Sequence, residues 1–233
     1  MSDNPRQNIT FPSNGGEAHG YLAVPEAGSG PGVVVIQEWW GLTDHMVDVV
    51  DRLAAEGFVA LAPDLYGGTT THDSGEAGTL MAALPVEQAA RDLSGAVDHL
   101  LSHEAVTGDR VGALGFCMGG GFVLVLAAQA GDKVGAAVSY YAIFNTETDP
   151  DLSGITAPVL GHFGGADDFA NPERAAHIES MVRDQSGVDV TFHIHDGAGH
   201  AFFNEGDAFG TYDADLAAST WQETVGFLRS NLN

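Results

Sequence analysis

The chain has 233 residues, of which 44% are hydrophobic, so it is long enough for one sizeable core and too apolar to be disordered. Its 32 acidic and 8 basic residues give a formal net charge of −24, which disfavours nucleic acids and anionic membranes as partners. No apolar run approaches the roughly 18 residues of a membrane-spanning helix, and the first residues lack the basic start and apolar centre of a secretory signal.

Two features of the composition predict the compartment. A single cysteine, Cys117, cannot form an internal disulfide, which favours a cytoplasmic location. Only one of the basic residues is a lysine, Lys133. Together with the large negative charge, this predicts a salt-adapted cytoplasm, as in halophilic microbes, because salt screens the repulsion within the compact chain. An ordinary acidic protein is the alternative interpretation.

Strands and helices are predicted to alternate along a single domain over residues 1–233, with residues 1–8 as a flexible N-terminal segment. Apolar runs and alternating patterns predict strands at 19–25, 32–38, 58–65, 110–116, 135–144, 157–164 and 188–197. Helical spacing predicts helices at 43–57, 86–103, 121–130, 171–185 and 213–231, whereas 71–79 has the composition of a loop. This order predicts an α/β fold with a mainly parallel central sheet and helices on both faces.

Ligands of such sheets bind at the carboxyl ends of the strands, so the strand-to-helix turns draw attention. The segment Gly115–Gly119 reads GFCMG, the form of a nucleophile elbow with Cys117 in place of serine. The helix that follows would favour the thiolate, and the backbone N–H of Met118 would be available to an oxyanion. The alternatives are a cysteine that packs in the core and a glycine turn that serves tight packing. A phosphate-binding loop is disfavoured because the lysine and hydroxyl residue of that motif are missing.

A cysteine nucleophile needs a base and an acid that orients it. Asp167 follows the strand predicted at 157–164, and His200 follows the strand predicted at 188–197, so the order is nucleophile, acid, histidine. Asp168 is the alternative acid. His193 and His195 share one strand face, but no ligand spacing completes a metal site, and packing or surface roles are favoured.

A fourth turn follows the strand predicted at 32–38. Glu38 lies at the end of this strand and would face the same crevice, either as a capping or solvated carboxylate or as a group that controls the protonation of the thiol. The backbone N–H of Trp39 would then be the second oxyanion donor.

Six segments, taken together and in this order, resemble the dienelactone hydrolase family of the α/β-hydrolase superfamily. They are VVVIQEWWGL, GFVALAPDLYGG, VGALGFCMGGG, SYYAIF, HFGGADDFANP and DGAGHAFF, and the resemblance runs from about residue 8 to the end. It implies an α/β-hydrolase fold and the cleavage of a small-molecule ester or lactone without a metal or organic cofactor. The roles that it implies are nucleophile for Cys117, acid for Asp167, base for His200, holder of the thiol proton for Glu38 and backbone oxyanion donors for Trp39 and Met118.

The chain departs from the family at the group that binds the substrate carboxylate. The best-known members use two arginines, but this chain has Asn204 at one position and no arginine in the stretch 71–80 that should hold the other. Ester or lactone chemistry is therefore predicted more firmly than a dienelactone substrate. A broad carboxylesterase or thioesterase with the same triad, and a non-hydrolytic thiol or binding protein on the scaffold, are the alternative functions.

Overall fold

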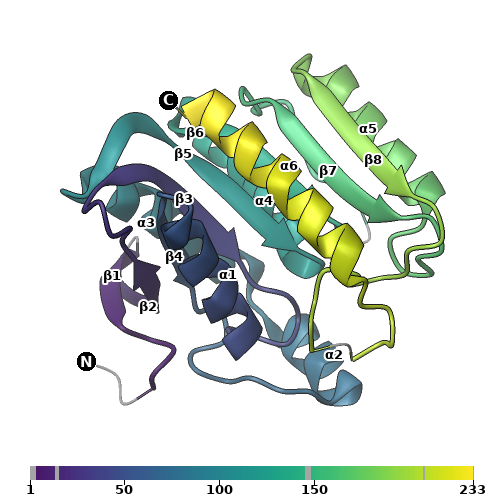
Figure 1. Ribbon diagram of the computed structural model, residues 1–233, viewed down its shortest axis with the longest axis horizontal. Helices are drawn as coiled ribbons and strands as arrows, with labels where there is room; N and C mark the ends of the chain where they lie inside the picture. The colour runs from purple at the N-terminus through teal and green to yellow at the C-terminus, as the bar shows by residue number, and fades with distance from the viewer. Residues whose placement is uncertain (1–3, 14–15, 145–147, 207, 233) are drawn as a thin grey trace.

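The computed structural model describes residues 4–13, 16–144, 148–206 and 208–232. Within these residues, eight strands form one sheet in the order β1-β2-β4-β3-β5-β6-β7-β8 (Figure 1). The two N-terminal strands pair antiparallel, and the six from β3 to β8 are parallel to one another. The strands are β1 (Ile9–Ser13), β2 (Gly16–Ala23), β3 (Gly30–Ile36), β4 (Val59–Pro63), β5 (Val106–Phe116), β6 (Val134–Tyr140), β7 (Val159–Gly164) and β8 (Val190–His195).

Helices cover both faces of the sheet. They are α1 (Asp44–Ala55), α2 (Ser74–Ala83), α3 (Val86–Ser102), α4 (Met118–Ala130), α5 (Pro172–Ser186) and α6 (Ala214–Leu232), with a short 3₁₀ turn at Gly131–Lys133. Figure 1 shows α1 and α6 in front of the sheet and α3 and α4 behind it. Because both faces are covered, every residue of β4, β6 and β7 is buried, as the continuous apolar runs predict. The predicted fold class is confirmed.

The loop predicted at 71–79 is wrong, because most of it belongs to helix α2. Asp73 caps this helix: its side chain accepts a hydrogen bond of 2.9 Å from the backbone N–H of Glu76. Two glycines inside the helix, Gly75 and Gly78, lower its intrinsic propensity and hide it from a reading of composition. The edge strand β1 was also not predicted. It pairs with β2 and packs against α3.

The N-terminal segment 1–8 lies in part outside the described residues, which begin at residue 4. Gln7 is buried, and its side-chain amide donates a hydrogen bond of 2.7 Å to Asp64.

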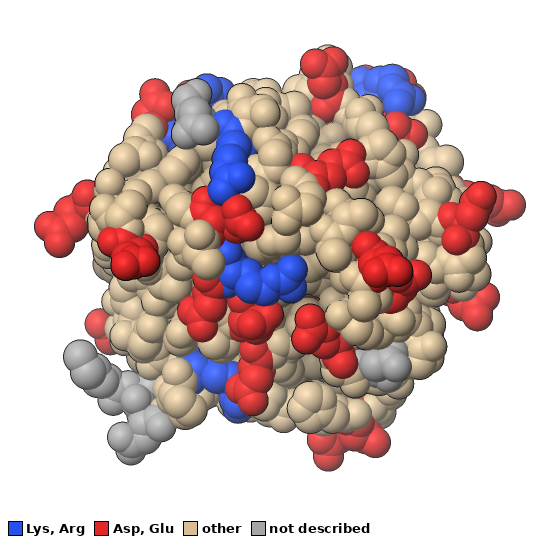
Figure 2. Space-filling model, viewed as in Figure 1, with Lys and Arg blue, Asp and Glu red and all other residues tan. Residues whose placement is uncertain are grey.

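Acidic side chains are spread over the face seen in Figure 2, and the basic ones there lie beside acidic neighbours. Ion pairs at the surface include Arg6–Asp44, Lys133–Asp98 and Arg229–Glu56 at 2.9, 2.8 and 2.7 Å. Such exposed pairs stabilise a fold by only about 0–1 kcal/mol each. Among the residues described, no helix combines the length and the apolar character needed to cross a membrane.

Candidate active site

Cys117 occupies the sharp turn between β5 and α4. Its φ of 56° and ψ of −119° are a strained conformation for a residue with a side chain, and such strain is common at functional turns. Hydrogen bonds hold the turn: the Cys117 N–H donates to the Tyr140 carbonyl, and the Cys117 carbonyl accepts from the Ile143 N–H, both at 3.0 Å. The thiol therefore lies at the N-terminus of α4, where the helix dipole favours negative charge.

Two glycines allow the elbow to pack against its neighbours. A Cβ on Gly115 would lie 2.3 Å from the Gly119 carbonyl oxygen, and a Cβ on Gly119 would lie 2.3 Å from the Ile36 carbonyl oxygen. Both distances are far below a real contact, so a larger residue at Gly119 would push α4 away from β3, and one at Gly115 would push α4 away from β5. The close approach brings the start of α4, with Met118, beside the end of β3, where Glu38 and Trp39 follow. The two backbone donors expected for an oxyanion thus come from adjoining segments.

His200 and Asp167 lie beside each other in the turns that follow β8 and β7. His200 Nδ1 is 2.7 Å from Asp167 Oδ2, and both side chains are almost fully buried. The other carboxylate oxygen, Oδ1, accepts the backbone N–H groups of Phe169 and Ala170 at 2.7 and 2.8 Å. Although burial alone would raise the pKa of Asp167, the hydrogen bonds and the charge of His200 lower it. The alternative acid, Asp168, is exposed, whereas His200 bonds Asp167.

The imidazole of His200 lies between this carboxylate and the cavity that Cys117 lines. Its Nδ1 hydrogen-bonds Asp167, and its ring lines the same cavity as Cys117. Burial alone would lower the pKa of His200, but the hydrogen bond with Asp167 and the interactions with Asp167 and Cys117 raise it to about 10. The site therefore favours an imidazolium next to the sulfur, as a nucleophilic thiolate requires.

Glu38 follows β3 at the same edge of the sheet and is almost completely buried. The Tyr141 hydroxyl donates to its Oε1 at 3.3 Å, and the Asn204 side-chain amide donates to its Oε2. Burial raises the pKa of Glu38 to about 7, although the charge of His200 and the two hydrogen bonds act in the opposite direction. Near neutral pH, Glu38 can therefore hold or release a proton within electrostatic reach of His200.

A cavity of about 150 Å³ opens above Cys117 and His200. Trp39, Met81, Ile143, Phe169 and Phe209 form its walls. Although Cys117 is only 5% exposed, its side chain lines this space, so a small substrate can reach the sulfur. No lysine or arginine is among the described residues that line the cavity. These walls around Cys117 therefore offer no cation to a substrate carboxylate.

The structure brings Cys117, Asp167 and His200 together and places Glu38 beside His200. Sequence reasoning missed Tyr141, and it treated Asn204 only as a missing arginine, whereas both bind the buried Glu38. Tyr141 directly follows β6, whose carboxyl end lies at the same edge of the sheet, and this position was the available signal. In the described part of the chain, no three His, Cys, Asp or Glu side chains are arranged to hold a metal ion.

Comparisons with known proteins place the chain in a family. The sequence model of the dienelactone hydrolase family matches residues 18–232. Protein usf of Aquifex pyrophilus is 34% identical over 97% of this chain and 99% of its own length. A protein of Aquifex aeolicus (strain VF5), named as a candidate carboxymethylenebutenolidase, is 32% identical over the same shares of the two chains.

A solved structure agrees with these sequence matches. The dienelactone hydrolase-like promiscuous phosphotriesterase P91, from metagenomic libraries, is 27% identical and superposes with a TM-score of 0.84 over 97% of both chains. The resemblance stated from the sequence motifs is therefore confirmed. The chain belongs to the dienelactone hydrolase family of α/β-hydrolases, a family of carboxylic ester hydrolases.

Proposed function

We propose that this protein hydrolyses an ester or lactone through a Cys117–His200–Asp167 triad and an acyl-thioester intermediate. The observation that carries the proposal is the buried His200, whose Nδ1 hydrogen-bonds the Asp167 carboxylate and which lines the same cavity as Cys117. The strained elbow at the start of α4 and the cavity above the sulfur support it. Membership of the family supports the choice of a carboxylic ester as substrate.

In the first half of the reaction, the Cys117 thiolate attacks the carbonyl carbon and a carbon–sulfur bond forms. The electron pair of the carbonyl double bond moves to oxygen, where the N–H groups of Trp39 and Met118 stabilise it. One such donor typically contributes roughly 3–4 kcal/mol to the transition state. The intermediate then collapses, the bond to the leaving oxygen breaks, and the imidazolium of His200 protonates that oxygen.

In the second half, neutral His200 takes a proton from water as the water oxygen attacks the thioester carbonyl. The carbon–sulfur bond breaks, the acid leaves and the thiolate is restored. Asp167 holds His200 in one tautomer and stabilises the imidazolium throughout. Glu38 holds the thiol proton in the resting enzyme, a role that its pKa of about 7 supports. Every step uses groups of the protein and water alone.

The test is turnover of a simple aryl ester by Cys117→Ala. We expect hydrolysis to fall to background while the melting temperature stays within a few degrees, because alanine removes one sulfur atom next to an existing cavity. Asp168→Asn is the matched control, since this exposed carboxylate neighbours the triad acid and should keep full activity. Turnover retained by the alanine variant would refute the assignment of the nucleophile.

A further inference from the structure

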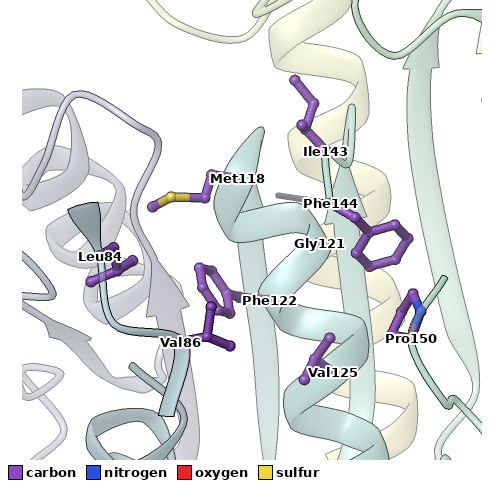
Figure 3. Close-up of a pocket in the computed structure, with 9 residues that line it drawn as sticks. All are labelled: Leu84, Val86, Met118, Gly121, Phe122, Val125, Ile143, Phe144 and Pro150. Carbon is purple, nitrogen blue, oxygen red and sulfur yellow. The ribbon is translucent and has the colours of Figure 1, made fainter. Parts of the chain in front are cut away.

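An apolar groove lies beside the catalytic cavity, on the outer side of α4 (Figure 3). Its walls come from the α2–α3 connection (Leu84, Val86), from α4 (Phe122, Val125) and from the segment after β6 (Phe144). Among the described residues, the side chains that line it are uncharged, and the only hydrogen-bonding atom they carry is the sulfur of Met118, which accepts from the Tyr66 hydroxyl. The groove can therefore select a ligand only by burying apolar surface.

The groove adjoins the site of the proposed reaction. Ile143 lines both the groove and the catalytic cavity. Met118, which lines the groove at the other side, directly follows Cys117 along the chain. Figure 3 shows the side chains of Met118 and Ile143 at one end of the groove and Val125 farther along α4. A group attached to a carbonyl carbon at the sulfur can enter the groove from that end.

The groove is a partly exposed apolar surface on a strongly acidic protein. Val86 is 45% exposed, one of four large hydrophobic residues with such exposure among the described residues, and Phe122, Val125 and Phe144 are each partly exposed beside it. On a chain with a net charge of −24, apolar side chains gathered in a groove next to the nucleophile are typical of a ligand site.

The position of His200 decides which arm of an ester the groove takes. The leaving oxygen must receive its proton from His200, which lines the catalytic cavity together with Phe169 and Phe209. His200 does not line the groove, which begins instead on the Met118 side of the sulfur. The alcohol arm therefore lies in the aromatic cavity, and the acyl arm extends along α4.

We infer that the apolar groove binds the acyl arm of the substrate, so that the preferred substrates are esters of uncharged aliphatic acids longer than acetate. This inference rests on the proposed function and specifies its substrate class. An acyl arm that ends in a carboxylate is disfavoured, since it would bury a charge against apolar side chains. The cation nearest to a groove wall among the described contacts, Arg174 over the Phe144 ring, is already paired with Asp149 at 2.9 Å.

Two series of substrates test the inference. The acyl series is the p-nitrophenyl esters of acetate, butyrate, hexanoate and octanoate; the alcohol series is acetate esters of alcohols of increasing length. A fully buried methylene improves kcat/KM about fourfold, and a groove open on one side should give about twofold. We expect this rise along the acyl series, with a smaller rise along the alcohol series. If the acetate ester is hydrolysed but kcat/KM stays flat or falls along the acyl series, the inference about the groove is overturned. If no ester is hydrolysed at all, the proposed function itself is contradicted.

Two substitutions locate the effect. Val86→Asp puts a charge into the groove at the first turn of α3, where a carboxylate suits the helix dipole and should not harm folding. Val125→Phe fills the groove from α4. In each variant, the ratio of kcat/KM for octanoate to that for acetate should fall by about tenfold. Val24→Asp is the matched control, because this valine after β2 is 41% exposed, and its ratio should not change. An unchanged ratio in both groove variants would overturn the inference.

Discussion

Substitution of the buried carboxyl group, Glu38→Gln, should change the stability of the protein in a direction that depends on pH. Burial raises the pKa of Glu38 from 4.5 to about 7, so folding opposes its ionisation. The folded-state pKa lies above the unfolded one. The native carboxyl therefore costs no stability below pH 4.5, and the cost grows as pH rises toward 7. The shift of about 2.5 units corresponds to about 3 kcal/mol above neutral pH.

Glutamine removes this cost but keeps only one of the two hydrogen bonds. Its carbonyl oxygen can accept from Asn204 or from Tyr141, while its amide group faces the other donor. The lost bond costs about 1 kcal/mol, so the net gain at about pH 9 is about 2 kcal/mol. For a chain of this size, that gain raises Tm by about 4–8 °C. At about pH 5 the native carboxyl is mostly neutral, and the variant should be equal to or a few degrees below the wild type.

The assay is thermal unfolding followed by circular dichroism at both pH values. Glu17→Gln, at an exposed position on β2, serves as the control and should show the same difference from the wild type at both pH values. If the Tm difference between Glu38→Gln and the wild type is the same at both pH values, the reasoning is refuted. Such a result would mean that ionisation of the native carboxyl does not destabilise the folded protein.

Three further outcomes follow from the same geometry. Asp167→Asn should lower kcat for an aryl ester by about ten-thousand-fold, since the tautomer of His200 is no longer fixed; a loss below about tenfold would show that another group orients the imidazole. Burial, with the charges of His195 and His193, lowers the pKa of His162 to about 3. Unfolding therefore takes up a proton below about pH 6.5, so His162→Leu should reduce the loss of stability between that pH and about 3, as measured by urea midpoints. If His162→Leu loses as much stability as the wild type over this pH range, His162 is not the source of the loss. Finally, the net charge of −24 predicts that KCl up to about 1 M raises Tm, and a constant Tm would remove the case for salt adaptation.

The elements that position the proposed triad were predictable because each follows a strand with a strong sequence signal. Cys117 comes directly after β5, whereas Asp167 and His200 lie in the turns after β7 and β8, and parallel strands bring their carboxyl ends to one edge. The glycines around Cys117 added the geometry of the turn. These signals are local in the sequence, and the parallel arrangement of the strands then brings the three residues together.

What the sequence could not show depends on contacts between distant residues. Glu38 is bound by Tyr141 and Asn204, which lie 103 and 166 positions away, and no spacing rule encodes such a pair. The position of Met81 in the cavity wall could not be predicted for a different reason. The glycines of α2 give this helix the composition of a loop. The groove was hidden too, since its residues come from three separate segments.

Detection of the acyl group on sulfur tests the central claim most directly. The protein is mixed with an aryl ester that deacylates slowly, quenched in acid, digested and analysed by mass spectrometry. We predict the mass of the acyl group on the peptide that contains Cys117, formed in step with a burst of released phenol, and no such adduct in Cys117→Ala. Steady hydrolysis with Cys117 unmodified, and equally fast in the alanine variant, would contradict the account.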